Sequence, residues 1–201
     1  KTEFFQGSEE QMKHYFAGER VEFNMVAKIL KMPQIVVGAI NGPAMGLGLE
    51  VATAPDIKIA NRQQAIFGVN EALMGLTPLN MGVLRQLMGP SQAKRFMLRG
   101  ARSFPNYMDA EEARFTGLMD EVVDEDDFDE HVIGVARDIA DMPAEQCRLI
   151  KETMNLPIIE DAEETATRQF LLQTVLRGRD FQREQRQKLA DNYAGAGGGD
   201  E

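Results

Sequence analysis

Two glutamates stand apart from the other acidic residues of this sequence. Most of the 32 Asp and Glu residues lie in polar stretches such as the run DEDD at 124–127, which is typical of a solvated surface. Glu50 instead lies within the apolar segment MGLGLEVATA, and Glu71 lies within IFGVNEALM. A charged group in such surroundings is costly unless it has a partner or a function. The pair, each beside a turn, indicates a functional carboxylate site, whereas either one alone is equally well explained as a structural acid near a helix start.

The segment GPAMGLGLE, residues 42–50, has three interpretations. It can be a phosphate cradle, a close-packed turn, or a turn whose backbone N–H groups face a ligand beside a carboxylate. The first is disfavoured, because the segment is neither G-x-G-x-x-G nor followed by a Lys-Ser/Thr pair, and Glu50 would repel a phosphate. The other two interpretations stay open on the local sequence.

Other catalytic or metal-binding residue types have no suitable context. Cys147 lies in a helical pattern and is expected to be packed, His14 is expected on a helix surface, and His131 among acidic residues is expected to be solvated or ion-paired. No ligand spacing for a metal site is present, so no metal is expected. The three serines lack the G-x-S-x-G context of a nucleophile: Ser8, Ser91 and Ser103.

Composition narrows the class of protein. The 201 residues carry a net charge of −10, which disfavours binding to nucleic acid or to anionic membranes. The single cysteine excludes an intrachain disulfide. No apolar run is long enough to span a bilayer and no secretory signal is visible. We therefore expect a soluble cytoplasmic protein, with an organelle matrix left open because the chain starts at Lys1 without a methionine.

Hydrophobic periodicity predicts alternating strands and helices in the first part of the chain. A helix is expected over 8–32, and the β-branched run 34–40 is expected to be a strand buried on both faces. Residues 46–53 form a turn entering a short helix that ends at Pro55. Strands follow at 56–60 and 65–67, and then a helix over 80–99 broken at Gly89-Pro90.

The remaining chain is predicted to be mainly helical. A short helix over 109–115 stops at Gly117, and a strand covers 118–123. This pattern indicates an α/β core over 1–125, a helical region over 126–192 and a disordered glycine-rich tail over 193–201. Four helices are expected in the helical region: 126–141, 143–154, 159–177 and 179–192.

Several blocks, taken in order, resemble the enoyl-CoA hydratase/isomerase (crotonase) superfamily. They are PQIVVGAINGPAMGLGLEVATAPDIKIA, AIFGVNEALMGLTP, LRQLMG, AKRFMLRGARSF and DAEEARFTGLMDEVV. The match runs from about 32 to 123, with a weaker match through the C-terminal helices. The blocks are specific to the superfamily and much less specific to the reaction, because this fold hosts hydration, isomerisation, hydrolysis and C–C cleavage.

The resemblance implies a spiral of ββα units with a C-terminal helical trimerisation region, in homotrimers that often pair into hexamers. The substrate would be an acyl-coenzyme A thioester, with no separate cofactor. Two backbone N–H groups would hold the thioester oxygen, and the one in this segment belongs to Leu47. The substrate-binding positions would be Met45, Gly46, Pro78 and Leu79.

The resemblance also implies roles for both glutamates. In hydratases of this family the pair holds a water molecule and adds it across the α,β double bond. Glu50 would position and activate the water, and Glu71 would transfer a proton at the α-carbon. Two carboxyls close together in an apolar pocket do not both ionise cheaply, so one would stay protonated near neutral pH.

Two features depart from the family pattern. The second oxyanion donor of relatives lies upstream of Lys1, so it and the N-terminal strands are expected to be missing from this sequence. Where many hydratases have P-G-x-G-G, this chain has PLNMG at 78–82, which would reshape the acyl pocket around Leu79, whose N–H position helps to hold the water in relatives. Basic residues that relatives place near the coenzyme A phosphates have candidates here: Arg177, Arg179, Arg183, Arg186 and Lys188.

Three functions follow from this reading. The first is an enoyl-CoA hydratase. The second is another acyl-CoA enzyme of the same fold, either a double-bond isomerase, a hydrolase or a C–C lyase, which the altered 79–81 segment favours. The third is a non-catalytic binding subunit, favoured by the missing donor and disfavoured by the presence of both glutamates.

Overall fold

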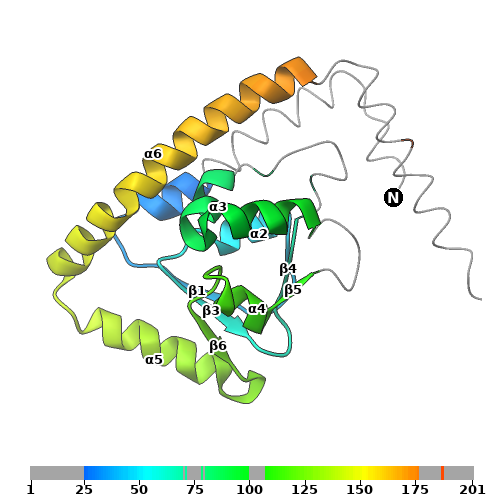
Figure 1. Ribbon diagram of the computed structural model, residues 1–201. Helices are drawn as coiled ribbons and strands as arrows, with labels where there is room; N and C mark the ends of the chain where they lie inside the picture. Colours follow the sequence, from blue (N-terminus) through cyan, green and yellow to red (C-terminus); the bar gives the residue numbers. More distant parts are fainter. Residues whose placement is uncertain are drawn as a thin grey trace, which may run out of the picture.

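Two small β-sheets lie at the centre of the molecule, with helices around them (Figure 1). The computed structural model describes residues 25–69, 71, 78, 80–99, 107–176 and 187. The start of the predicted first helix, the predicted helix 179–192 and the tail 193–201 lie outside these residues. Residues 25–31, the end of the first predicted helix, are helical.

Each sheet has three short strands. The first sheet is parallel throughout, in the order β1-β3-β6. The second has the order β2-β4-β5, with β2 parallel and β5 antiparallel to β4. The strands are β1 (Val37–Ile40), β2 (Ala44–Met45), β3 (Ile57–Asn61), β4 (Ile66–Gly68), β5 (Met108–Asp109) and β6 (Glu121–Val123).

The first four strands alternate between the two sheets. β1 and β2 are followed by α2 (Leu47–Ala52), and β3 and β4 are followed along the chain by α3 (Met81–Arg99). Because β1 pairs with β3 and β2 with β4, the second ββα unit lies directly beside the first. This is the repeated ββα arrangement expected from the sequence.

Strand β1 corrects one prediction. The run 34–40 was expected to be buried on both faces, but Ala39 is exposed and Val37 is only half-buried. Within the described part of the chain, β1 has a neighbouring strand on one side only. An edge strand of a three-stranded sheet has fewer neighbours to cover it, whatever its sequence.

Short strands were also missed or misplaced. The two-residue strands β2 and β5 were not predicted, because two residues cannot show an alternating pattern. β6 begins at Glu121 rather than at 118. Leu118 and Met119 are nevertheless fully buried, in the turn that precedes the strand.

Two local predictions about helices are confirmed. α3 is kinked at Gly89, whose φ of 76° interrupts the helix immediately before Pro90. The helix α4 (Ala110–Phe115) is capped by Asp109, whose Oδ1 accepts a hydrogen bond from Glu112 N at 2.8 Å. Its end is followed by Gly117 at a φ of 82°.

The C-terminal helices differ from the prediction at one place. α5 (Phe128–Ala140) follows a short 3₁₀ turn at Glu125–Asp127. The predicted helices 143–154 and 159–177 are one helix, α6 (Ala144–Leu176), that continues through Pro157. Proline removes the hydrogen bond to the carbonyl of Thr153. Both residues are exposed, so water can solvate that carbonyl.

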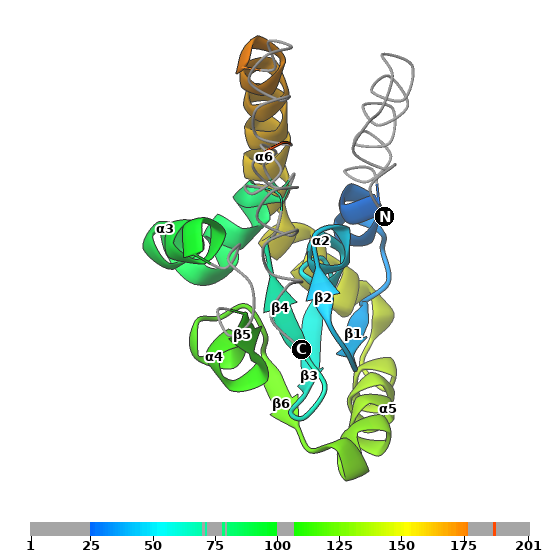
Figure 2. The same ribbon diagram turned by 90° about the vertical axis from the view of Figure 1, so that its right-hand side faces the viewer.

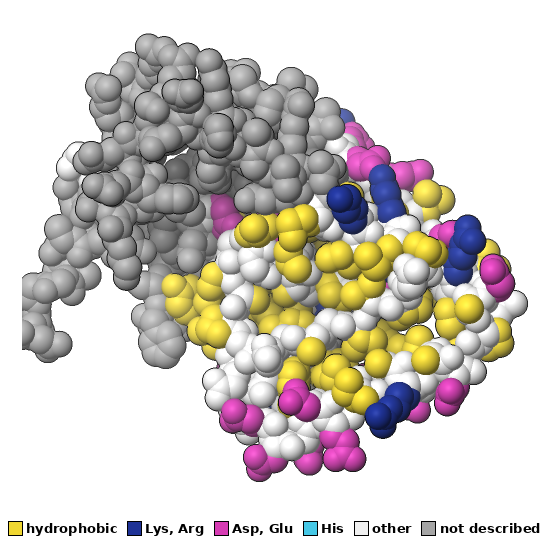
Figure 3. All heavy atoms as spheres, turned by 180° about the vertical axis from the view of Figure 1, so that it is seen from behind, with side chains coloured by type: hydrophobic (Ala, Val, Ile, Leu, Met, Phe, Trp, Pro, Cys, Tyr) yellow, Lys and Arg dark blue, Asp and Glu magenta, His cyan; other side chains and the backbone are white. Residues whose placement is uncertain are grey.

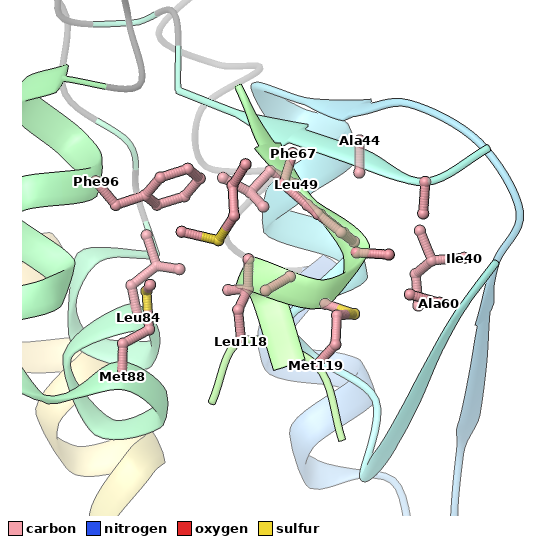
Figure 4. Close-up of a cluster of buried hydrophobic side chains, with 14 of the residues drawn as sticks. Ile40, Ala44, Leu49, Ala60, Phe67, Leu84, Met88, Phe96, Leu118 and Met119 are labelled. Carbon is pink, nitrogen blue, oxygen red and sulfur yellow. The ribbon is translucent and has the colours of Figure 1, made fainter. Parts of the chain in front are cut away.

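The main core lies between the sheets and helices α2, α3 and α4. Figure 4 shows Leu49, Phe67, Leu84 and Leu118 pointing toward one another from four different elements or turns. A smaller cluster joins the helix at 25–31 to α3 and α6. In the turned view α3 and α4 lie on one side of the strands and α5 on the other (Figure 2). None of the helices in the described ranges is both long and apolar enough to cross a bilayer.

Candidate active site

Gly46 is the residue on which the candidate site is built. It joins β2 to α2 as the N-cap, with φ 55° and ψ −125°. Its N–H donates to Gly68 O at 3.4 Å and its carbonyl accepts from Glu50 N at 3.1 Å. This combination of angles is open to glycine and strained for other residues. Glycine is therefore required by the backbone at this position.

Glu71 lies against this glycine. A Cβ atom added to Gly46 would lie 3.2 Å from Glu71 Oε1. The Glu71 side chain is buried, with 9% of the residue exposed. The parallel pairing of β2 with β4 brings these residues together, because Met45 is in register with Gly68.

Glu50 is joined to the same glycine through the backbone, since its N–H donates to the Gly46 carbonyl at 3.1 Å. It lies in α2, which begins immediately after Gly46, and is only 3% exposed. Leu49 beside it belongs to the main core. The two glutamates singled out in the sequence are thus both buried and both next to Gly46.

The remaining predicted residues have different surroundings. Leu47 is the first residue of α2 and is 39% exposed. No described residue other than glycine has a positive φ, so Leu47 has an ordinary backbone conformation. Helix geometry leaves the first N–H groups without an acceptor within the helix, and that of Leu47 is one of them. Pro78 is buried, and Leu79 lies outside the described residues.

The side chain of Met45 and the ring of Tyr107 both pack against Gly68, and the sequence analysis did not point to Tyr107. A Cβ on Gly68 would lie 2.5 Å from Met45 Sδ and 2.7 Å from Tyr107 Cδ1. Only glycine permits this approach of a thioether and a ring to the same strand. Tyr107 lies far from the quoted motifs, and no local pattern marks it.

Thr53 and Asn80 form a second contact that the sequence did not reveal. Thr53 Oγ1 donates to the backbone carbonyl of Glu50 at 2.8 Å. Asn80 Nδ2 donates in turn to Thr53 Oγ1 at 3.0 Å. Both polar residues are buried. In the sequence, Asn80 is distinguished only because it lies in PLNMG, where many hydratases have a glycine-rich run.

The other candidates have structural surroundings. His131 Nε2 lies 2.5 Å from Glu121 Oε2, so the expected ion-paired environment is confirmed. Cys147 is half-buried. Among the described residues no group of His, Cys, Asp and Glu could hold a metal ion. The five basic residues proposed to contact coenzyme A lie outside the described residues.

A surface hollow is present whose lining includes neither Glu50 nor Glu71. It has a volume of about 400 Å³. Its charged side chains largely pair with one another: Arg62 pairs with Glu111 and with Asp124, and His131 pairs with Glu121. Such pairing leaves little free charge to recognise a ligand.

The sequence is similar to a known protein family and to several named proteins. A family model described as enoyl-CoA hydratase/isomerase matches residues 4–195. A probable enoyl-CoA hydratase, EchA17 of Mycobacterium tuberculosis, is 35% identical over 126 residues, which cover 62% of this chain and 46% of that protein. A short-chain-enoyl-CoA hydratase of Clostridioides difficile is 36% identical over 125 residues, which cover 61% of this chain and 76% of that protein. The match thus spans about half the length of the mycobacterial relatives.

Solved structures agree in fold. An enoyl-CoA hydratase from Mycobacterium avium subsp. paratuberculosis superposes with a TM-score of 0.73 and 26% identity, over 85% of this chain and 69% of that one. An enoyl-CoA hydratase from Bacillus anthracis gives a TM-score of 0.65 and 28% identity, over 81% of this chain and 64% of that one. The spiral of ββα units is the fold that these proteins share.

Proposed function

The chain belongs to the enoyl-CoA hydratase/isomerase family, and from that premise we propose that it adds water across the α,β double bond of an enoyl-CoA thioester. The observation that carries the proposal is the placement of both glutamates. Glu50 and Glu71 are both buried, and both adjoin the Gly46 turn. The names of the relatives, several of them enoyl-CoA hydratases, support the same reaction.

The two carboxyl groups would divide the proton transfers. Glu50 takes a proton from a water molecule while the water oxygen bonds to the β-carbon. Glu71 gives a proton to the α-carbon as the double bond is lost. The proton on Glu50 must then pass to Glu71 before the next turnover, and a shared water molecule would carry it. General acid–base catalysis of this kind contributes about 10²- to 10⁴-fold in rate.

The backbone would stabilise the charge that develops on the thioester oxygen. In the enolate-like transition state that oxygen becomes negative, and the N–H of Leu47 would donate to it. A donor aimed at developing charge in a dry site is worth about 10²- to 10³-fold in kcat. Met45, Gly46, Pro78 and Leu79 would line the thioester and acyl group. Coenzyme A enters as part of the substrate, and no separate cofactor is required.

The first test is the loss of enoyl-thioester absorbance from crotonyl-CoA, with identification of the 3-hydroxyacyl product. We expect the wild-type chain to catalyse the loss. Glu50→Gln and Glu71→Gln should each lower kcat by about 10²-fold or more, since each removes one proton transfer while keeping the shape of the side chain.

Glu121→Gln is the matched control. Glu121 is half-buried in β6 and pairs with His131 of α5. Strand β6 belongs to the sheet β1-β3-β6 and not to the sheet whose strand β2 leads into Gly46. Substitution of Glu121 should leave kcat unchanged. Equal losses in all three variants would mean that the effect is general destabilisation, and absence of turnover with any enoyl-CoA would remove the hydratase proposal.

A second candidate is another acyl-CoA reaction on the same fold: double-bond isomerisation, hydrolysis or C–C cleavage. The observation in its favour is Asn80, a buried amide at a position within the altered 78–82 segment. Product analysis with different acyl-CoA classes separates it from hydration. A non-catalytic binding subunit is the third candidate, and turnover that is lost on Glu71→Gln would eliminate it.

A further inference from the structure

The backbone of Glu50 is held by a short chain of directed hydrogen bonds. The Thr53 hydroxyl has one proton, which it donates to the carbonyl of Glu50 at 2.8 Å. Its oxygen accepts a hydrogen bond from Asn80 Nδ2 at 3.0 Å. A hydroxyl group can do both at once, so the direction of both bonds is defined. This series of bonds runs from Asn80, the residue before α3, to the residue that carries the candidate catalytic carboxylate.

The helix that carries Glu50 needs such support. α2 has only six residues, and Thr53 is its C-cap. Helices this short are not stable by themselves and depend on tertiary contacts. The Thr53 hydroxyl bonds to the carbonyl of Glu50 itself, so it acts on the turn that positions the carboxylate.

Asn80, at the other end of this series of hydrogen bonds, is held in place by the packing of α3. Asn80 immediately precedes α3, and its carbonyl accepts from Leu84 N at 2.9 Å. Two residues further on, a Cβ on Gly82 would lie 2.8 Å from Ala162 Cα, so the backbones of α3 and α6 are in close contact. Asn80 therefore stands at the start of a helix that is fixed against another helix. The hydrogen bond from Asn80 to Thr53 therefore holds the end of α2 in a defined place relative to α3.

Stability does not account for this pair of polar residues. Asn80 is 1% exposed and Thr53 is 2% exposed. Within the described part of the chain, Asn80 Oδ1 is buried and accepts no hydrogen bond. A buried acceptor that is not satisfied is costly, and an apolar pair of similar shape would avoid that cost. The directional bonds to the Glu50 turn are what the polar pair adds.

We propose that Thr53 and Asn80 are positioning residues, which hold the backbone of Glu50 so that its carboxylate stays in reach of the reacting water. This inference rests on the proposed hydratase function for its catalytic readout. The proposal adds Thr53, at the end of α2, and Asn80, just before α3, to a candidate site whose other members lie around Gly46. They act through Glu50 and not on the substrate.

The test compares turnover in variants of the 201-residue chain. Thr53→Val removes the hydroxyl with little change of shape, and Asn80→Ala removes the amide. Each should lower kcat by roughly ten- to a hundredfold, because small misplacements of a catalytic group have effects of this size, while KM stays within about twofold. Thr53→Ser keeps the hydroxyl, so its kcat should stay within about threefold of the wild-type value.

Thr116→Val is the matched control. Thr116 is the C-cap of the six-residue helix α4, and its hydroxyl bonds to the carbonyls of Glu112 and Ala113 at 2.9 and 3.2 Å. It therefore has the local role of Thr53, but it is bonded neither to Glu50 nor to an asparagine. Thr116→Val should leave kcat unchanged. The inference is overturned if Thr116→Val lowers kcat as much as Thr53→Val does.

The double variant tests whether the two residues act together. Because both belong to one chain of bonds, Thr53→Val with Asn80→Ala should lower kcat no further than the larger single effect. Single effects that multiply in the double variant mean independent roles and contradict the inference.

A second measurement does not depend on turnover. With carbon-13 at the carboxyl carbon of glutamate, the Glu50 resonance can be assigned by its loss in Glu50→Gln. It should shift in Thr53→Val and Asn80→Ala and stay in place in Thr116→Val. If the wild-type chain hydrates no enoyl-CoA, the proposed function fails, and this spectrum still decides the inference. A Glu50 resonance that does not move in either variant overturns it.

Discussion

Gly46 and Glu71 constrain each other in the structure. The glycine has φ 55° and ψ −125°, and the space beside its Cα is occupied by Glu71 Oε1. Two separate physical reasons thus disfavour a side chain at position 46. The first is backbone strain of about 1–3 kcal/mol, and the second is a steric conflict with the proposed proton donor.

Gly46→Ala is therefore expected to reduce activity more than stability. The new methyl group would push Glu71 or the α2 start out of place and lower kcat by about a hundredfold. Steady-state kinetics and urea unfolding of the same samples measure both effects. Gly134→Ala is the control, because Gly134 lies in α5 and a Cβ added there would have nothing within 4 Å. A Gly46→Ala protein with wild-type kcat would contradict the proposed geometry.

At the scale of elements, α6 is docked by a buried lysine. Lys151 Nζ donates to Asp56 Oδ2 at 2.7 Å and to the carbonyls of Ile29 and Gln34 at 2.9 and 2.8 Å. The lysine side chain is 1% exposed. Asn155, one turn further along α6, donates to Asp56 Oδ1 at 3.3 Å. These bonds hold α6 against the segments that lead into β1 and β3.

Lys151→Met should destabilise the chain by about 3–5 kcal/mol, because it leaves the Asp56 carboxylate buried without its cation. Urea unfolding followed by circular dichroism measures the change. Lys31→Met is the matched control. Lys31 pairs with Glu163 at 2.5 Å with both side chains about half exposed, so its loss should cost at most about 1 kcal/mol. Similar losses in both variants would mean that the buried cluster adds no more than a surface pair.

At the scale of the whole molecule, α6 has an exposed apolar face in addition to the face that is buried against the chain. One face carries Lys151, Asn155 and Ala162 and is buried against the chain. The other carries large hydrophobic side chains that are more than half exposed: Leu149, Ile150, Met154 and Leu156. Seen from behind, the surface also shows hydrophobic side chains gathered in the middle and acidic ones along the lower edge (Figure 3). A group of exposed apolar side chains of this kind is typical of a surface that binds another protein.

We expect this outer face of α6 to take part in self-association, in line with the homotrimer or hexamer that the family resemblance implies. Leu149→Glu with Ile150→Glu should lower the molar mass measured by analytical ultracentrifugation to that of the monomer. Leu98→Glu is the control, since Leu98 is an exposed leucine on α3, and it should leave the mass unchanged. A wild-type chain that sediments as a monomer would contradict the expectation.

The sequence by itself determined the local features. The glycine after an apolar run marked the turn at Gly46, the Gly89-Pro90 pair marked the kink in α3, and apolar surroundings singled out Glu50 and Glu71. The motif blocks also predicted the family and its ββα repeat. Each of these signals is contained in a few consecutive residues or in their order, because turns, kinks and an acid within an apolar segment are features of residues that are neighbours in the sequence.

The tertiary structure decided whatever depends on contact between distant segments. It placed Glu71 beside Gly46, Asn80 beside Thr53 and Lys151 beside Asp56. It also left β1 at a sheet edge and carried α6 through Pro157. No local pattern encodes these outcomes, because strand pairing and helix packing are decided by the free energy of the whole fold, which can override local preference.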